Sequence, residues 1–295
     1  MLYNESTMNT PKDIPNKPND APDKRRGASL GPLGIRFFAY VQSKGTVEEK
    51  TAIVETGELQ TALGLTPVQE RKLLSRLSRA EMIARVRRRL YLAPKKLPSW
   101  GKWSPDMALA INTLMRDKGG RYQICGPNMF NEYGFSTQVP VLVYAYNDKI
   151  SGSKKIGSVY LELIKVGPER LGDTEDVRWR SGEIAVYSSR VRTLVDAVYD
   201  WPRFGYLTRV YRWIRRDLRE DRITAEALVE CTLRYGDIAT IRRIGTLLET
   251  LGVDDRLLEK LEKRLKPTMA TIPWLPKKPK RGKLNKRWGV IINGE

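Results

Sequence analysis

One stretch of the sequence, residues 64–93, restricts the folds open to this chain more than any other. Thr66 has the hydroxyl side chain that helix N-caps favour, Pro67 suits the first helical position, and Gln69 completes a capping-box pattern. Apolar residues recur at helical spacing after Pro67. The sequence therefore predicts a helix that begins at Thr66.

The two faces of this predicted helix differ in chemistry. At about 100° per residue, one side carries Leu73, Leu74, Leu77 and Ala80. The opposite side and its flanks carry Val68, Arg71, Lys72, Ser75, Arg76 and Arg79. One face is thus suited to a hydrophobic core and the other to contact with anions.

A basic hairpin is predicted directly after the helix. Met82 and Ile83 end the helical pattern, and Leu90 and Leu92 then alternate with Tyr91 as strand residues do. The first strand and the turn contain Arg85, Arg87, Arg88 and Arg89. A basic helix followed by a basic hairpin is typical of a recognition helix and its wing.

Two shorter helices are expected before this pair. Apolar residues from Leu33 to Val41 recur at helical spacing, and Thr56 is expected to cap a second helix that stops at Gly64. The order of elements predicts a winged helix-turn-helix over residues 31–96. Any amphipathic helix has a solvated charged face. The absence of acids among the outward arginines and lysine favours an anion-binding face over that simpler interpretation.

The rest of the chain is expected to form a larger α+β domain over residues 105–295, with strands first and a helical bundle last. Residues 1–30 read as a flexible leader and residues 97–104 as a linker, in which Trp100 and Trp103 can dock on either neighbour. Helices are expected at 105–115 and 126–133, and strands at 122–125, 139–146, 158–166 and 182–188. A loop containing SGSKK is expected between two of these strands. The helical period begins at Ser189, and RWGVIIN near the end is a candidate late strand.

The net charge of +19 indicates a polyanionic partner. Residues 31–100 contain 13 basic and 6 acidic side chains, and residues 267–295 contain 7 and 1. Neither segment has the broad apolar face that a lipid surface requires, and the chain has no apolar run long enough to span a bilayer. A cytoplasmic protein without membrane contact is expected.

Catalytic chemistry is not expected. The chain has no histidine, and Cys125 and Cys231 are isolated, which predicts two buried free thiols and no metal site. A nucleotidyltransferase needs a Gly-Ser turn followed by two acids on one strand face, but Gly152-Ser153 is followed only by Glu162. The Asp173-Thr174-Glu175 run is expected to lie in a loop. We therefore predict no enzymatic activity, no catalytic residues and no cofactor.

The tail contains a lysine-rich segment with two alternative interpretations. Its candidate phosphate contacts are Lys277, Lys278, Lys280 and Arg281. They either add a second, non-specific phosphate contact or belong to a solvated connector that leads to the last strand. The prolines at 276 and 279 keep the segment from extending the helical bundle before it.

Several short segments of the second domain share a narrower resemblance. They are GRYQICGPNMFNEYGFSTQVP at 120–140, VYSSRVRTLVDAV at 186–198, RRIGTLLETLG at 242–252 and KLNKRWGVIING at 283–294. In this order, behind a winged helix, they resemble the antitoxins of abortive-infection AbiE toxin–antitoxin systems over about residues 31–295. The hairpin of that family often has a glycine at its tip, where this chain has Arg88 or Arg89, and a histidine where this chain has Tyr133.

The resemblance implies an antitoxin of type IV that opposes a nucleotidyltransferase toxin encoded in the same operon, with or without direct contact. It also implies autoregulation through inverted repeats in double-stranded promoter DNA. Within the winged helix, Arg71, Lys72, Ser75 and Val68 are candidates for base contacts, and the remaining arginines for phosphate or minor-groove contacts. Two alternatives remain: a ligand-responsive winged-helix repressor without a toxin partner, and a basic RNA-binding protein.

Overall fold

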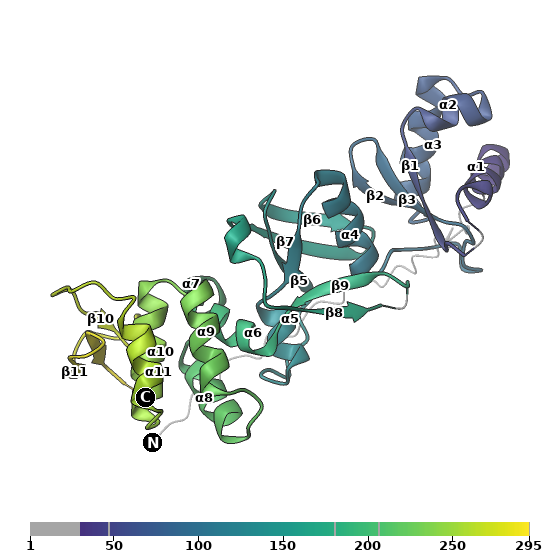
Figure 1. Ribbon diagram of the computed structural model, residues 1–295. Coiled ribbons are helices and arrows are strands. Elements are labelled where there is room, and N and C mark those ends of the chain that lie inside the picture. The colour runs from purple at the N-terminus through teal and green to yellow at the C-terminus, as the bar shows by residue number, and fades with distance from the viewer. Residues whose placement is uncertain (1–29, 47, 180, 206, 295) are drawn as a thin grey trace, which may run out of the picture.

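In a computed structural model of the chain, the described residues are 30–46, 48–179, 181–205 and 207–294. An N-terminal unit, a central sheet and a group of C-terminal helices follow one another along an elongated molecule (Figure 1). The predicted α+β class is confirmed. The leader predicted over residues 1–30 lies, except for Leu30, outside the described residues.

The N-terminal unit combines three helices with a three-stranded antiparallel sheet in the order β1-β3-β2. Its elements are α1 (Gly31–Ser43), β1 (Thr51–Glu55), α2 (Glu58–Leu63), α3 (Pro67–Arg79), β2 (Ala84–Arg87) and β3 (Leu90–Pro94). Sequence analysis did not predict β1. Its alternation is short, with Ala52 and Val54 buried and Ile53 exposed between them, and it pairs with β3 rather than with a strand next to it in the chain.

The predicted start of α3 is confirmed. The Thr66 hydroxyl accepts a hydrogen bond from the backbone amide of Gln69 at 3.3 Å, and the Gln69 side chain accepts one from the amide of Thr66 at 2.9 Å. This capping box satisfies two amides that a helix start leaves unpaired. Leu73, Leu74 and Leu77 are buried in the same core as Phe37 of α1, so the apolar face lies where the periodicity placed it.

The start of α2 corrects the sequence analysis, because its N-cap is Gly57 and not Thr56. Gly57 has φ +112°, a backbone conformation that favours glycine. The capping groups come from α3 instead. The fully buried carboxylate of Glu70 accepts hydrogen bonds from the amides of Gly57 at 2.8 Å and Leu59 at 3.2 Å, and from the Gln60 side chain at 2.7 Å. One buried acid therefore fixes α2 against α3.

The central sheet has six strands in the order β6-β7-β5-β4-β9-β8, with parallel pairs β5·β7 and β4·β9. Its strands are β4 (Tyr122–Ile124), β5 (Leu142–Asn147), β6 (Gly152–Ile156), β7 (Val159–Lys165), β8 (Thr174–Arg178) and β9 (Ile184–Ser188), with helices α4 (Met107–Lys118) and α5 (Pro127–Glu132) and the 3-10 turn η1 (Pro168–Arg170). Two expected loops are strands: SGSKK lies mostly in β6, and Thr174-Glu175 opens β8. Both form edge strands with largely exposed side chains, so neither has the buried alternation that predicts a strand.

The β2–β3 hairpin contributes to two hydrophobic cores. Val86, Leu90 and Leu92 pack in one hydrophobic core with Ile111 and Leu114 of α4. On the other face, Ala93 of β3 belongs to the core beneath α3, and Tyr91 packs against it. The N-terminal unit and the sheet therefore share a continuous apolar contact across the predicted linker at 97–104.

The C-terminal part is helical, as the sequence predicted, and ends in a small sheet in the order β10-β12-β11. Its elements are α6 (Arg190–Tyr199), α7 (Trp201–Phe204), α8 (Leu207–Arg219), α9 (Ala225–Tyr235), α10 (Ile238–Thr250), α11 (Asp255–Glu262), β10 (Ile272–Pro273), β11 (Lys283–Asn285) and β12 (Val290–Ile292). The buried Trp288 ring lies so close to Gly245 of α10 that a Cβ there would come within 2.4 Å of it. The absence of a side chain at Gly245 thus allows the terminal sheet to dock on α10.

We expect Glu70→Ala to lower the free energy of unfolding by about 3 kcal/mol, because it leaves buried backbone amides without an acceptor. Urea unfolding measures this loss. Glu48→Ala, which removes an exposed acid of the same unit, is the control and should change stability by less than about 0.5 kcal/mol. Equal stability of the two variants would show that the Glu70 carboxylate contributes nothing to the joint between α2 and α3.

Candidate nucleic-acid interface

The outward face of α3 is basic over its whole length. Arg71, Lys72, Arg76 and Arg79 are exposed, and Ser75 is half-buried between them. Val68, in the first turn, is 48% exposed, although its side chain is apolar. Glu70 is the acidic residue of this helix, and it points into the unit rather than outward. The outward face therefore combines long cationic side chains with one exposed apolar group.

The hairpin brings further cations beside this helix. Arg85 is exposed on β2, and Arg88 and Arg89 form the two-residue turn. Arg89 has φ +72°, which costs a residue with a Cβ about 1–2 kcal/mol relative to an ordinary conformation. Glycine would adopt this conformation without that cost. The chain thus has an arginine at a turn position whose geometry favours glycine.

A surface groove of about 940 Å³ separates α3 from the hairpin. Its basic lining consists of Arg71, Arg79, Arg85, Arg88 and Arg89. A second hollow of about 590 Å³, on the neighbouring side of α3, is lined by Arg71, Lys72, Ser75, Arg76, Arg79 and Ala80. Of the predicted helix and hairpin residues, all but Val68 and Arg87 line one of these two hollows.

The cations of this surface form no ion pairs with acids among the residues that the structure describes. Within the described ranges, no carboxylate forms an ion pair with Arg71, Lys72, Arg76, Arg79, Arg85, Arg88 or Arg89. Unpaired cations in a concave surface raise the local concentration of anions, because their field is not cancelled at short range. Phosphate groups of nucleic acid fit such a surface, and arginine and lysine also reach acceptor atoms on base edges.

Arg87 lies in a different environment from the other predicted arginines. Its guanidinium donates to both carboxylate oxygens of Asp117 at the end of α4, with Nε 2.8 Å from each. The hydrogen bond from Arg87 holds the pKa of the Asp117 carboxyl below its ordinary value. Arg87 therefore joins the hairpin to α4. It does not belong to the exposed cations of the α3 and hairpin surface.

The predicted tail cations lie far from this surface. Lys277, Lys278, Lys280 and Arg281 are exposed on the segment between β10 and β11, at the end of the molecule opposite α3 (Figure 1). The side chain of Asn293 holds this segment, donating to the carbonyls of Leu275 at 2.9 Å and Pro279 at 2.9 Å. The structure does not bring these cations together with the helix and hairpin residues.

Sequence analysis missed two contributors to this surface. Tyr91 and Gln60 line the groove with the arginines. Tyr91 was recognised as a strand residue, but its side of the strand could not be assigned before the pairing with β1 was known. Gln60 is held by the buried Glu70 carboxylate, a contact between helices that no local pattern indicates.

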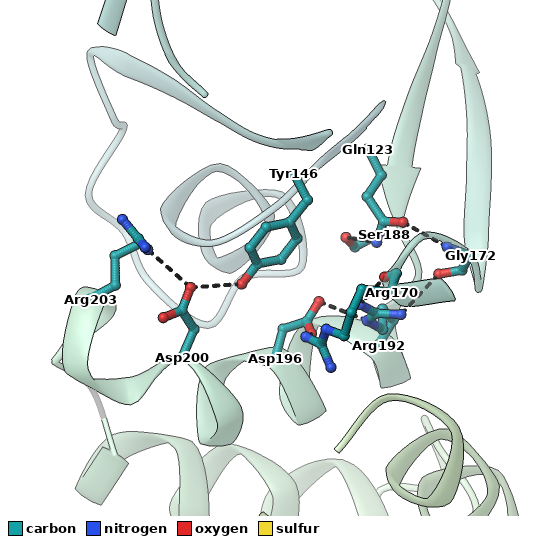
Figure 2. A network of polar contacts seen from close by, with 9 residues as sticks. All are labelled: Gln123, Tyr146, Arg170, Gly172, Ser188, Arg192, Asp196, Asp200 and Arg203. Atoms are coloured by element: carbon teal, nitrogen blue, oxygen red, sulfur yellow. Dashed lines mark hydrogen bonds and ion pairs between the residues drawn. The ribbon is translucent and has the colours of Figure 1, made fainter. Parts of the chain in front are cut away.

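A buried polar network joins α6 to the central sheet (Figure 2). Arg192, fully buried, donates to the Asp196 carboxylate at 2.8 Å and to the Arg170 carbonyl at 2.6 Å. The Gln123 side chain accepts from the Gly172 amide at 2.8 Å. Paired charges in a closed interior hold elements in register rather than meet a partner. Two residues of the 186–198 segment, Arg192 and Asp196, thus hold α6 against its neighbours.

Other predicted features of the chain are now placed. Cys125 and Cys231 are buried free thiols, as predicted, and burial raises the pKa of both. Among the described residues, no helix combines the length and apolar character needed to cross a bilayer. The same residues contain no group of three or more acids and cysteines with the spacing of a metal site.

Comparisons with known proteins give a family match over part of the chain and a similar solved structure. Residues 62–178 match a family described as a family of unknown function, DUF6088. The crystal structure of the RV2827C protein from Mycobacterium tuberculosis is similar over 87% of this chain and 90% of its own, with 14% sequence identity and a TM-score of 0.48. The search of curated proteins returned no match. The family match extends from α2 to β8 and so includes α3, the hairpin and most of the sheet.

We expect the ion pair between Arg87 and Asp117 to make stability depend on acid pH. Because the folded pKa of Asp117 is lowered, its contribution is present above the unfolded value of about 4 and is lost as pH falls through the folded pKa. The midpoint of urea unfolding should therefore fall less between about pH 5 and 3 for Asp117→Asn than for the unmodified protein. Asp176→Asn, at an exposed position of β8, serves as the control. Parallel pH profiles for Asp117→Asn and the unmodified protein would contradict the assignment.

Proposed function

We propose that residues 31–96 act as a winged helix-turn-helix that binds double-stranded promoter DNA and represses the operon of this protein. We further propose that the chain is the antitoxin of a type IV, AbiE-like toxin–antitoxin system and counteracts a nucleotidyltransferase toxin. The first proposal is argued from the geometry of α3 and the hairpin. The second is argued from the resemblance of the later segments.

One observation carries the DNA-binding proposal: a capped helix with an unpaired basic face beside a groove that a basic hairpin closes. A helix of this kind fits the major groove of DNA, where its outward side chains reach base edges, while a hairpin beside it contacts the backbone. The dual attachment of the hairpin to α3 and α4 favours the same reading, because a fixed wing sets the angle at which α3 meets the duplex.

The contacts divide by position on this surface. Arg71, Lys72, Ser75 and Val68, on the exposed side of α3, are proposed to contact bases, with the Val68 methyl groups meeting a thymine methyl. The residues proposed to contact phosphates or the minor groove are Arg76, Arg79, Arg85, Arg88 and Arg89. Arg87 supports the hairpin through Asp117 and is assigned no direct contact.

We expect Lys72→Ala to weaken binding to the promoter by about 1 to 3 kcal/mol and to reduce the preference for promoter over random duplex. Arg88→Ala should weaken binding to both duplexes alike. It should also reduce the slope of log affinity against log salt concentration by about 0.9. Mobility shifts at several salt concentrations measure both quantities. Equal affinity of the unmodified protein for promoter and random duplex at about 150 mM salt would overturn the proposal.

The tail offers a matched control for charge. Alanine at Lys277, Lys278, Lys280 and Arg281 removes four cations from the opposite end of the molecule. On a duplex that carries one half-site, this variant should bind as the unmodified protein does, because so short a duplex contacts only the α3 end. A loss as large as that of Lys72→Ala would mean that total charge, and not the α3 surface, determines affinity.

The antitoxin proposal rests on the resemblance of residues 120–140, 186–198, 242–252 and 283–294. These segments belong to the central sheet and the C-terminal helices and not to the α3 surface. Repression and protection from the toxin should therefore depend on different surfaces of the chain.

We expect a nucleotidyltransferase reading frame beside this one to arrest growth when expressed alone, and this chain to restore growth. Lys72→Ala should lose repression of a promoter fusion and still restore growth, because the substitution leaves the central and C-terminal parts unchanged. The absence of any adjacent toxic reading frame would overturn the antitoxin proposal and leave the DNA-binding proposal standing.

A further inference from the structure

A second surface groove, of about 700 Å³, lies between the N-terminal unit and the central sheet. Arg79 and Arg85 line it from the N-terminal side, and Lys155 and Tyr160 line it from β6 and β7. Trp100 of the connecting segment lies along it as well. Neither the winged-helix surface nor the antitoxin segments include the residues that the sheet contributes.

The two walls of this groove are held at a fixed distance. The backbone amide of Trp103 donates to the Glu81 carbonyl at 2.7 Å, and the Ser158 amide donates to the Ser104 hydroxyl at 2.8 Å. The connecting segment is thus bound to the N-terminal unit at one residue and to the β6–β7 turn at the next. Strand β2 also packs beside β6, which brings the two walls of the groove together.

The lining of the groove is cationic and aromatic. The Lys155 ammonium lies 4.8 Å from the centre of the Tyr160 ring, and hydrogen bonding to Tyr160 raises the pKa of Lys155, so the lysine stays charged. The lining acid, Glu81, is paired with Lys102 at 2.8 Å. Among the described residues, Arg79, Arg85 and Lys155 form no ion pair.

Two aromatic side chains stand open to solvent beside these cations. Trp100 is 76% exposed and Tyr160 is 41% exposed. Large exposed aromatics are costly to solvate and mark contact surfaces, and next to cations they suit a ligand with both anionic and flat apolar parts. The sugar–phosphate backbone of nucleic acid has this combination, with phosphates for the cations and sugars for the rings.

The groove is continuous with the surface of α3, because Arg79 and Arg85 line both. We infer that it binds the backbone of the same DNA duplex, beyond the bases that α3 reads, with Lys155 on a phosphate and Trp100 and Tyr160 against the sugars. The inference rests on the proposed function and extends it: the central sheet takes part in DNA binding and lengthens the contacted site on one side.

The test compares two lysines of one strand pair on a promoter duplex with its flanks. Lys155→Gln should reduce the slope of log affinity against log salt by about 0.9 and keep the preference for promoter over random duplex. Lys165→Gln, at the far end of β7, is the matched control and should change neither. A variant with Trp100→Ala, Tyr160→Ala and Lys155→Gln should lose hydroxyl-radical protection on one flank and keep it at the centre.

The outcomes separate this inference from the proposed function. The inference alone is overturned if the protein prefers the promoter but two results are unchanged. These are the slope of log affinity against log salt for Lys155→Gln and the footprint of the triple variant. A reduced slope without any promoter preference would support the groove as a phosphate contact and overturn the proposed function. If single-stranded DNA of equal length competes better than duplex DNA for binding in the groove, the groove binds unpaired bases and the inference fails. All three substituted side chains are exposed, so equal urea midpoints would confirm that the variants fold.

Discussion

The sharing of the β2–β3 hairpin between two hydrophobic cores is the constraint on which the rest of this structure depends. A hairpin at the edge of a small unit ordinarily has one face in the core and one in water. Here Val86, Leu90 and Leu92 would be left exposed if the central part of the chain were absent, and α4 covers them. The position of α3 is therefore set through two interfaces, the hairpin on α4 and the Glu70 carboxylate on α2. The hairpin beside α3 is thus held by the central part of the chain as well as by its own unit.

The charges of the chain fall into two classes by their surroundings. Interior charges, such as Glu70 and the Arg192–Asp196 pair, are hydrogen-bonded to neighbouring groups. Glu70 joins α3 to α2, and Arg192 joins α6 to the carbonyl of Arg170. Within the described residues, the cations around α3 form no ion pair with an acid, and they are exposed. A solvated unpaired charge costs little in stability, whereas a buried one is costly without a partner. The proposed DNA-binding surface is thus separated from the groups that hold the fold, with Arg87 at the boundary between them.

Local signals in the sequence were sufficient for part of the fold and of the site. The cap at Thr66, the apolar face of α3, the basic hairpin and the C-terminal helices each depend on residues close together in the chain, and each lies where it was predicted. The features that were missed depend on distant partners. Strand β1 exists because it pairs with β3, β6 and β8 are exposed edges of a sheet, and the cap of α2 comes from α3. The groove shared with Lys155 and Tyr160 could not be foreseen for the same reason, because it requires the hairpin to pack beside β6.

The turn at Arg88 and Arg89 has a further consequence for how such a scaffold can change. Both strands of the hairpin are committed to a core, but the two-residue turn between them projects beyond either one. Exchanging its residues alters the charge carried at the tip without disturbing the packing of α3 or α4, and a glycine at Arg89 would even relax the backbone. The affinity of this end of the molecule for polyanions can therefore change in evolution without a change in the stability of its fold.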